Sequence, residues 1–206
     1  MHDMVANSEV TLAGKASGRR PPLPGDSGVW FFICADMGMF ALFFLLFSFG
    51  QVMDPETYRA SRAMLDPAVG LANTLILIVS GWLVVRAVEA GRAGERLQAR
   101  RKVIAALAVG SGFAALKVYE YSHKIMAGIT LQTNEFFSYY YAFTGIHFLH
   151  FMVGVGVLLI TISRLSAPDD DGTAGGWLES AAAYWHMVDL LWVVLFPMLY
   201  LAGGTA

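Results

Sequence analysis

Long hydrophobic runs separated by short polar stretches dominate the pattern of this sequence. A helix needs about 20 mainly apolar residues to cross the hydrocarbon core of a bilayer, which is roughly 30 Å thick. Four runs are close to or above that length, namely residues 29–49, 69–87, 139–162 and 178–202. Each of them is therefore predicted to form a transmembrane helix.

A fifth run, residues 103–116, is apolar but would cover only about 21 Å as a helix. It is followed by Lys117, Glu120, His123 and Lys124, so two interpretations compete. Either the segment does not span, or the helix continues with Lys117 and Glu120 paired toward the bundle interior. Their spacing of three residues puts both on one helical face, and charges inside a membrane usually face the interior. We favour the span, which makes the fold all-α with five transmembrane helices.

Basic residues are concentrated on one side of the predicted membrane. On this side are Lys15, Arg19, Arg20, Arg86, Arg92, Arg96, Arg100, Arg101, Lys102 and Arg164. Those on the opposite side are Arg59, Arg62 and Lys124. The positive-inside rule then predicts a cytoplasmic N-terminus and a C-terminus outside. Residues 1–24 form a polar cytoplasmic arm in this prediction, residues 25–206 form the membrane domain, and the acidic residues 169–171 lie in a cytoplasmic loop.

Composition agrees with a membrane protein and excludes several kinds of site. Of 206 residues, 56% are hydrophobic and 15% charged, whereas a soluble domain carries roughly 25% charged residues. The formal net charge of −2 gives no sign of a nucleic-acid partner. The single cysteine, Cys34, excludes a cysteine-cluster metal site. No phosphate-binding glycine loop or nucleophile elbow is present, so the chain alone is not predicted to be an enzyme.

Function in a membrane bundle is usually carried by the few ionisable residues inside the spans. Here these residues are Asp36, Lys117, Glu120, His123, His147, His150, His186 and Asp189. Three pairs among them are spaced by three residues, so three helices each present a polar stripe to their neighbours. We expect an interhelical polar core of Lys117, Glu120, His123, His147, His150, His186 and Asp189. Tyr139, Tyr140, Tyr141 and Tyr200 lie near span ends and are expected to be interfacial anchors.

A metal or haem site is the alternative use of the histidines. A di-metal carboxylate bundle needs several Glu-x-x-His pairs, and this chain has one, Glu120 with His123. Haem would need only one or two histidines, so the number of histidines does not exclude a haem site. Asp36 is a lone carboxylate on the first span. It is either a proton-accepting or helix-docking group, or a solvated carboxyl without a role in turnover.

Several segments, read with their polar residues, resemble subunit III of the haem-copper oxidases. They are WFFICADMGMFALFF (30–44), ANTLILIVSG (72–81), the Glu120–Tyr121 pair, TGIHFLHFMVG (144–154) and AAAYWHMVDLLWVVLF (181–196). They follow the order of that family's helices. Two further segments, PGDSGVWFF (24–32) and KIMAGITLQTNEFF (124–137), are most similar to the five-helix NorE type that accompanies nitric oxide reductases.

The resemblance implies a non-catalytic accessory subunit without haem or metal, in the bacterial cytoplasmic membrane beside a haem-copper catalytic subunit. It also implies that phospholipid can be bound, with His147, His150 and Trp185 as lipid-binding candidates and Asp36 as the proton-linked candidate. The alternatives are subunit III of an oxygen-reducing cytochrome c or quinol oxidase, and a freestanding haem- or metal-binding membrane protein. Two positions depart from the family pattern: Asp36 replaces a glutamate, and Phe148 replaces a glycine between the two histidines.

Overall fold

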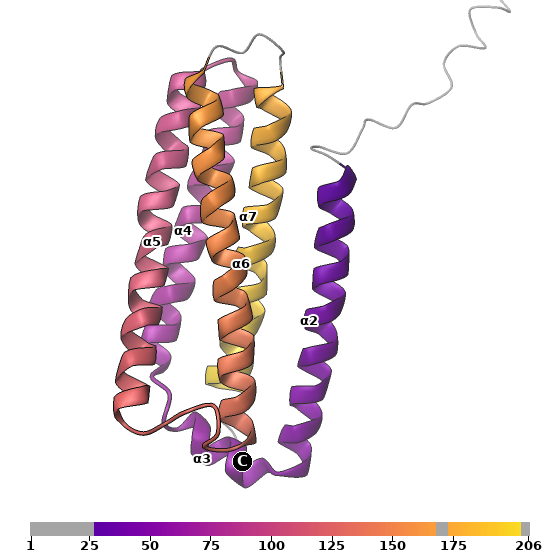
Figure 1. The fold of residues 1–206 in the computed structure, drawn as a ribbon, viewed down its shortest axis with the longest axis vertical. Coiled ribbons are helices and arrows are strands. Elements are labelled where there is room, and N and C mark those ends of the chain that lie inside the picture. Colours follow the sequence, from indigo (N-terminus) through magenta and orange to yellow (C-terminus); the bar gives the residue numbers. More distant parts are fainter. Residues whose placement is uncertain (1–26, 168–172, 203–206) are drawn as a thin grey trace, which may run out of the picture.

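The fold is a bundle of long helices, seen in a computed structural model that describes residues 27–167 and 173–202 (Figure 1). The helices are α2 (Ser27–Met53), α3 (Pro55–Arg62), α4 (Pro67–Arg92), α5 (Arg96–Met126), α6 (Glu135–Ser166), α7 (Ala174–Phe196) and the π-helical turn η1 (Pro197–Leu201). Within these described residues, five helices are long and apolar enough to cross a membrane, as predicted. The expected N-terminal arm, 1–24, and the acidic residues 169–171 lie outside the described residues.

Helix α5 is the span whose existence depended on its charged half. It begins at Arg96 and continues past Lys117 and Glu120 to Met126, which confirms the prediction of a continuous helix. The basic residues 100–102 lie inside this helix, in its early turns. Arginine and lysine are good helix formers whose stems can lie along apolar surface, so a basic stretch does not end a helix.

The short helix α3 was not predicted. Asp54 caps it by accepting a hydrogen bond from the Thr57 backbone nitrogen at 3.2 Å, and Pro55 occupies its first turn. Both are common signals for a helix start. The helix has only eight residues, most of them polar, so it contains no hydrophobic run that would indicate it in the sequence.

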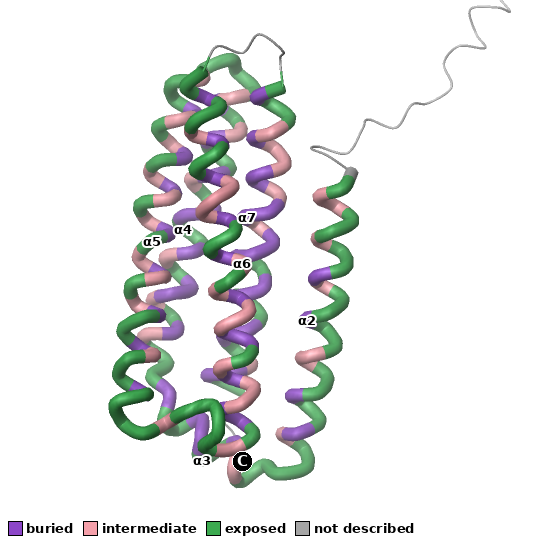
Figure 2. Tube along the Cα trace, viewed as in Figure 1, coloured by how far each residue is buried: buried purple, intermediate pink, exposed green. Residues whose placement is uncertain are grey.

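Helices α4, α5, α6 and α7 pack together, while α2 stands to one side of them (Figure 1). In the most hydrophobic 18-residue stretch of α2, 11% of the residues are buried, compared with 56% in the corresponding stretch of the last span. Figure 2 shows the same contrast, with exposed residues along the outward side of α2 and buried residues concentrated on α7. Helix α7 therefore forms the centre of the bundle, and α2 is its most loosely attached helix.

The centre of the bundle depends on close approach of helices around Trp185, which is fully buried on α7. A Cβ atom on Gly110 of α5 or on Gly154 of α6 would lie 3.0 Å from the Trp185 ring. The indole therefore lies between two glycines of neighbouring helices. Small residues at such contacts are how membrane helices approach closely in the absence of a hydrophobic driving force.

Pro197 begins a π-helical turn that ends at Leu201. The Ala202 nitrogen donates to the Pro197 oxygen at 2.8 Å. Arg62 of α3 donates through Nε to the Leu199 oxygen at 3.1 Å and through a terminal nitrogen to the Met198 oxygen at 3.2 Å. The last carbonyl groups of a helix have no donor within that helix, and in a membrane they must be satisfied by other groups.

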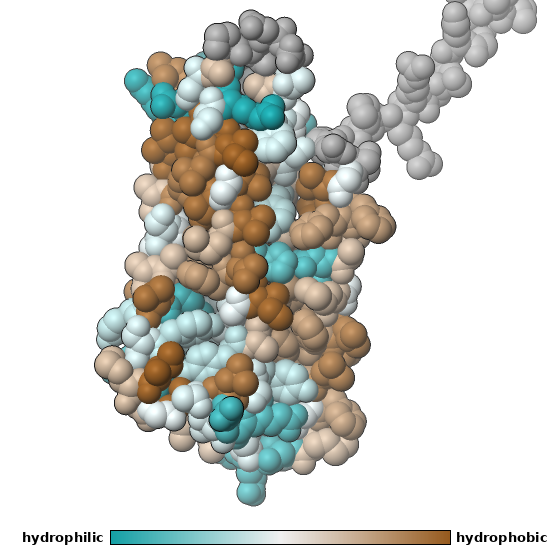
Figure 3. All heavy atoms as spheres, viewed as in Figure 1, coloured by the Kyte–Doolittle hydropathy of each residue, from teal (hydrophilic) through white to brown (hydrophobic). Residues whose placement is uncertain are grey.

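The α4–α5 connection, the end of α6 and the start of α7 lie at one end of the bundle (Figure 1). Several arginines lie there as well. Arg92 pairs with Glu179 at 2.9 Å, and Arg96 donates to the Arg164 and Ala167 oxygens, so it caps the end of α6. Figure 3 shows hydrophilic side chains at both ends and a hydrophobic band between them. The assignment of the arginine-rich end to the cytoplasm stays a prediction from charge.

We predict that Gly154→Leu lowers the free energy of unfolding by about 1–3 kcal/mol, the usual range for overpacking a filled core. The new side chain would meet the Trp185 ring. Gly156→Leu, on the same helix, is the matched control because a Cβ atom at that position would have no atom within 4 Å. Thermal unfolding in detergent measures both variants, and equal stability of the two would contradict the close packing.

Candidate functional site

The most buried ion pair among the described residues lies on α5. Lys117 is 0% exposed, and its Nζ atom donates to Glu120 Oε2 at 2.8 Å. The pairing follows the prediction made from their spacing. Two charges buried in apolar surroundings repay their lost hydration only with good geometry and further hydrogen bonds.

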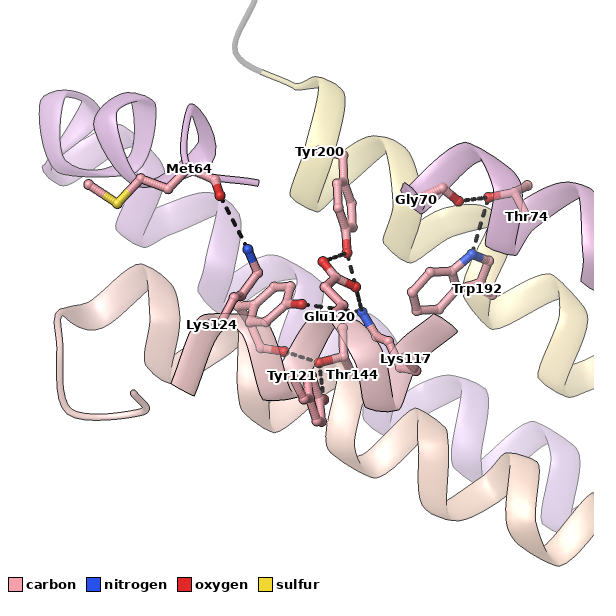
Figure 4. Close-up of polar contacts among 11 residues, drawn as sticks. Met64, Gly70, Thr74, Lys117, Glu120, Tyr121, Lys124, Thr144, Trp192 and Tyr200 are labelled. Carbon is pink, nitrogen blue, oxygen red and sulfur yellow. Dashed lines mark hydrogen bonds and ion pairs between the residues drawn. The ribbon is translucent and has the colours of Figure 1, made fainter. Parts of the chain in front are cut away.

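Those further hydrogen bonds come from two tyrosines on other elements, Tyr140 and Tyr200, of which Figure 4 labels Tyr200. Lys117 Nζ also donates to the hydroxyl of Tyr140 on α6 at 3.3 Å and to that of Tyr200 on η1 at 3.2 Å. The Tyr200 hydroxyl donates to Glu120 Oε1 at 2.7 Å. All three ammonium protons of Lys117 and both carboxylate oxygens of Glu120 are therefore used.

Aromatic rings complete the surroundings of the Lys117 ammonium. Its distances to ring centroids are 4.9 Å for Trp192, 5.0 Å for Tyr140, 5.4 Å for Tyr121 and 5.8 Å for Tyr200. A cation over aromatic faces gains further electrostatic stabilisation, most where water is excluded. The cluster ties α5 to α6, α7 and η1, so its arrangement fits a structural centre of the bundle.

The expectation that Tyr140 and Tyr200 are interfacial anchors was wrong, because both are buried in this cluster. A signal for Tyr140 was present in the sequence. It lies four residues before Thr144 and seven before His147, and all three are buried on one face of α6. Tyr200 lies beyond Pro197, where the α-helical periodicity is interrupted, so the sequence carried no such signal for it.

His147 and Trp185 were lipid-binding candidates, and the structure corrects both. Each is fully buried in the bundle and cannot be reached by surrounding lipid. The His147 ring lies 5.5 Å from the Phe113 ring and 5.2 Å from the Trp192 ring, measured between centroids. Neither nitrogen of His147 has a hydrogen-bond partner within the described residues. His147 therefore packs as part of an aromatic cluster.

His150 and Asp36 form a separate pair that links α6 to α2. His150 Nε2 lies 3.0 Å from Asp36 Oδ1, and His150 Nδ1 lies 2.8 Å from the Ile146 oxygen. A carbonyl oxygen can only accept, so Nδ1 carries a proton. The contact between Nε2 and Oδ1 then needs one shared proton. Figure 3 shows a hydrophilic patch on the hydrophobic surface where α2 faces α6.

The remaining three candidates among the polar residues lie in different surroundings. His186 Nδ1 is 3.6 Å from Asp189 Oδ2 on α7, and the His186 side chain is 41% exposed. His123 is exposed and lies against the Tyr119 ring of its own helix, so the structure does not bring it into the polar core. Among the described residues, no three His, Cys, Asp or Glu side chains come together as possible metal ligands.

Comparison with known proteins gives a consistent set of matches. The family described as cytochrome c oxidase subunit III matches residues 23–204. Cytochrome c oxidase subunit 3 of Synechocystis is 32% identical over 175 residues, which cover 84% of this chain and 74% of that protein. The same-named protein of Thermostichus vulcanus is 31% identical over 165 residues, covering 80% and 78%. Quinol oxidase subunit 3 of Bacillus subtilis is 25% identical over 186 residues, covering 85% and 86%.

We predict that Lys117→Met destabilises the bundle by about 3–5 kcal/mol, because it leaves the Glu120 carboxylate buried without its counter-charge. The double variant Lys117→Met/Glu120→Leu should recover most of that loss, since removing both charges removes the uncompensated one. Denaturant unfolding in detergent micelles, read by tryptophan fluorescence, measures the two variants. A double variant no more stable than Lys117→Met alone would show that the uncompensated Glu120 charge is not the source of the effect.

Proposed function

This chain belongs to the cytochrome c oxidase subunit III family, and on that premise we propose that it is a non-catalytic accessory subunit. It packs beside a haem-copper catalytic subunit in the bacterial cytoplasmic membrane. The observation that carries this proposal is the saturated cluster of Lys117, Glu120, Tyr140 and Tyr200. Its donors and acceptors are occupied by one another, which favours a role in holding helices together over a role in chemistry.

We propose that the catalytic partner is a nitric oxide reductase. Support comes from the similarity of segments 24–32 and 124–137 to the NorE type. The second segment runs from the end of α5 to the start of α6 and is held by hydrogen bonds. Asn134 caps α6 and donates to Ser61 Oγ at 2.7 Å, and the Tyr141 hydroxyl donates to the Ile129 oxygen at 2.8 Å. An oxygen-reducing oxidase is the second candidate partner, favoured by the names of the similar proteins.

We propose that phospholipid binds between α2 and the bundle. An apolar cavity of about 240 Å³ is lined there by Val29, Phe32, Val157, Trp177, Ala181 and Tyr184. An acyl chain suits such a lining because it needs no hydrogen bonds. Asp36 is the proton-linked residue of this proposal, since its carboxyl shares a proton with His150 at the same helix contact.

We predict that the tagged chain, purified in mild detergent from its native membrane, brings a haem-containing catalytic subunit with it. The measurement is an absorption spectrum of the complex with identification of its subunits by mass spectrometry. Stoichiometric haem on the chain alone, after its partners have been removed, would contradict the accessory role.

Deletion of the gene separates the two candidate partners. With a nitric oxide reductase as partner, the deletion strain should lose a large part of its nitric oxide consumption and keep its oxygen consumption. The control is the same strain carrying the intact gene on a plasmid. Loss of oxygen consumption with intact nitric oxide consumption would assign the chain to an oxidase.

A further inference from the structure

His186 is a polar side chain in a place where the bilayer does not favour one. It lies near the middle of the span Ala174–Leu201, and its side chain is 41% exposed on the surface of the bundle. Ionisable residues at this depth usually face the bundle interior, a water-filled cavity or a partner. His186 faces outward, so its surroundings in the membrane are incomplete in the isolated chain.

The imidazole lies beside α4 at Gly81. Asp189 is buried at the contact of α7 with α4, and a Cβ atom on Gly81 would collide with Asp189 Oδ2. The carboxylate therefore rests on the backbone of α4 at Gly81. His186 directs Nδ1 toward that carboxylate at 3.6 Å. No hydrogen bond to His186 Nε2 is found within the described residues, so this nitrogen is left for a group from outside.

An apolar surface surrounds His186 on both helices. Leu190 and Val193 follow it by four and seven residues on α7 and are 50% and 40% exposed. On α4, Ile78 and Val85 lie three residues before and four after Gly81, with 50% and 41% exposure. Residues at these spacings share a helical face. We call this surface of Ile78, Val85, His186, Leu190 and Val193 the α4–α7 face.

Other polar side chains on the lipid-facing surface satisfy themselves within their own helix. Ser48 donates to the Phe44 oxygen, Ser111 to the Leu107 oxygen and Ser122 to the Val118 oxygen, each at 2.8 Å. They need no partner. His186 has no such contact for Nε2 among the described residues, which distinguishes the α4–α7 face from these other exposed positions.

We propose that the α4–α7 face binds a transmembrane helix of the catalytic subunit, and that this helix carries a hydroxyl or amide group opposite His186. This inference rests on the proposed function. Acyl chains have neither donors nor acceptors, so lipid cannot satisfy the imidazole at this depth. Hydroxyl and amide groups can donate or accept and therefore suit Nε2 in either protonation state. Such hydrogen bonds between helices fix which faces meet.

Photocross-linking in the native membrane tests the location. A benzophenone amino acid at Leu190 should cross-link to the catalytic subunit. The control is the same substitution at Leu149, an exposed leucine on α6 that is 65% exposed. A cross-link from Leu149 and none from Leu190 would overturn the inference while leaving the proposed function intact. A Leu190 cross-link to a second copy of this chain would also overturn it.

Substitution of His186 tests the chemistry. His186→Leu should lower the amount of catalytic subunit recovered with the tagged chain by about tenfold, whereas His186→Asn, which keeps a hydrogen-bonding group, should recover most of it. Thermal unfolding of each purified variant separates lost docking from lost folding. Equal recovery with His186→Leu and wild type would overturn the inference. If wild type recovers no catalytic subunit at all, the proposed function fails and this inference fails with it.

Discussion

The bilayer core offers no water to a buried charge, and this constraint decides how the bundle is built. Lys117 is fully buried, so its ammonium must find all of its partners within the protein. Those partners come from the same helix, from α6 and from the turn after α7. Hydropathy alone would argue against a span that contains Lys117. In the structure, Lys117 is instead the residue at which α5, α6 and η1 meet.

The same constraint explains why α2 is attached differently from the other helices. Asp36 pairs with His150 next to an apolar cavity, and Gln51 near the end of α2 donates to the Ala202 oxygen. Few residues of α2 are buried, so van der Waals packing holds it less firmly than α7. Helix α2 is therefore held by a few polar contacts beside an apolar cavity, and it takes no part in the central cluster.

Much of this fold could be predicted from the sequence, because four spans follow from hydrophobic length and α5 follows from the spacing of Lys117 and Glu120. Periodicity tells which residues share a helical face, but it does not tell what lies opposite that face. For this reason Tyr200 was missed as a partner of Glu120, and His147 and Trp185 were wrongly assigned to lipid. Those contacts depend on how the helices pack, which no local pattern contains.

The π-helical turn at Pro197 has a consequence for biosynthesis. Its carbonyl groups are bound by Arg62, and its Tyr200 completes the surroundings of Lys117 and Glu120. Arg62, Lys117 and Glu120 leave the ribosome well before Tyr200, because chains are made from the N-terminus. The central cluster therefore stays open until Tyr200 has been translated and inserted. A chain ended before Tyr200 would carry the Lys117–Glu120 pair into the membrane without one of its hydrogen-bond partners.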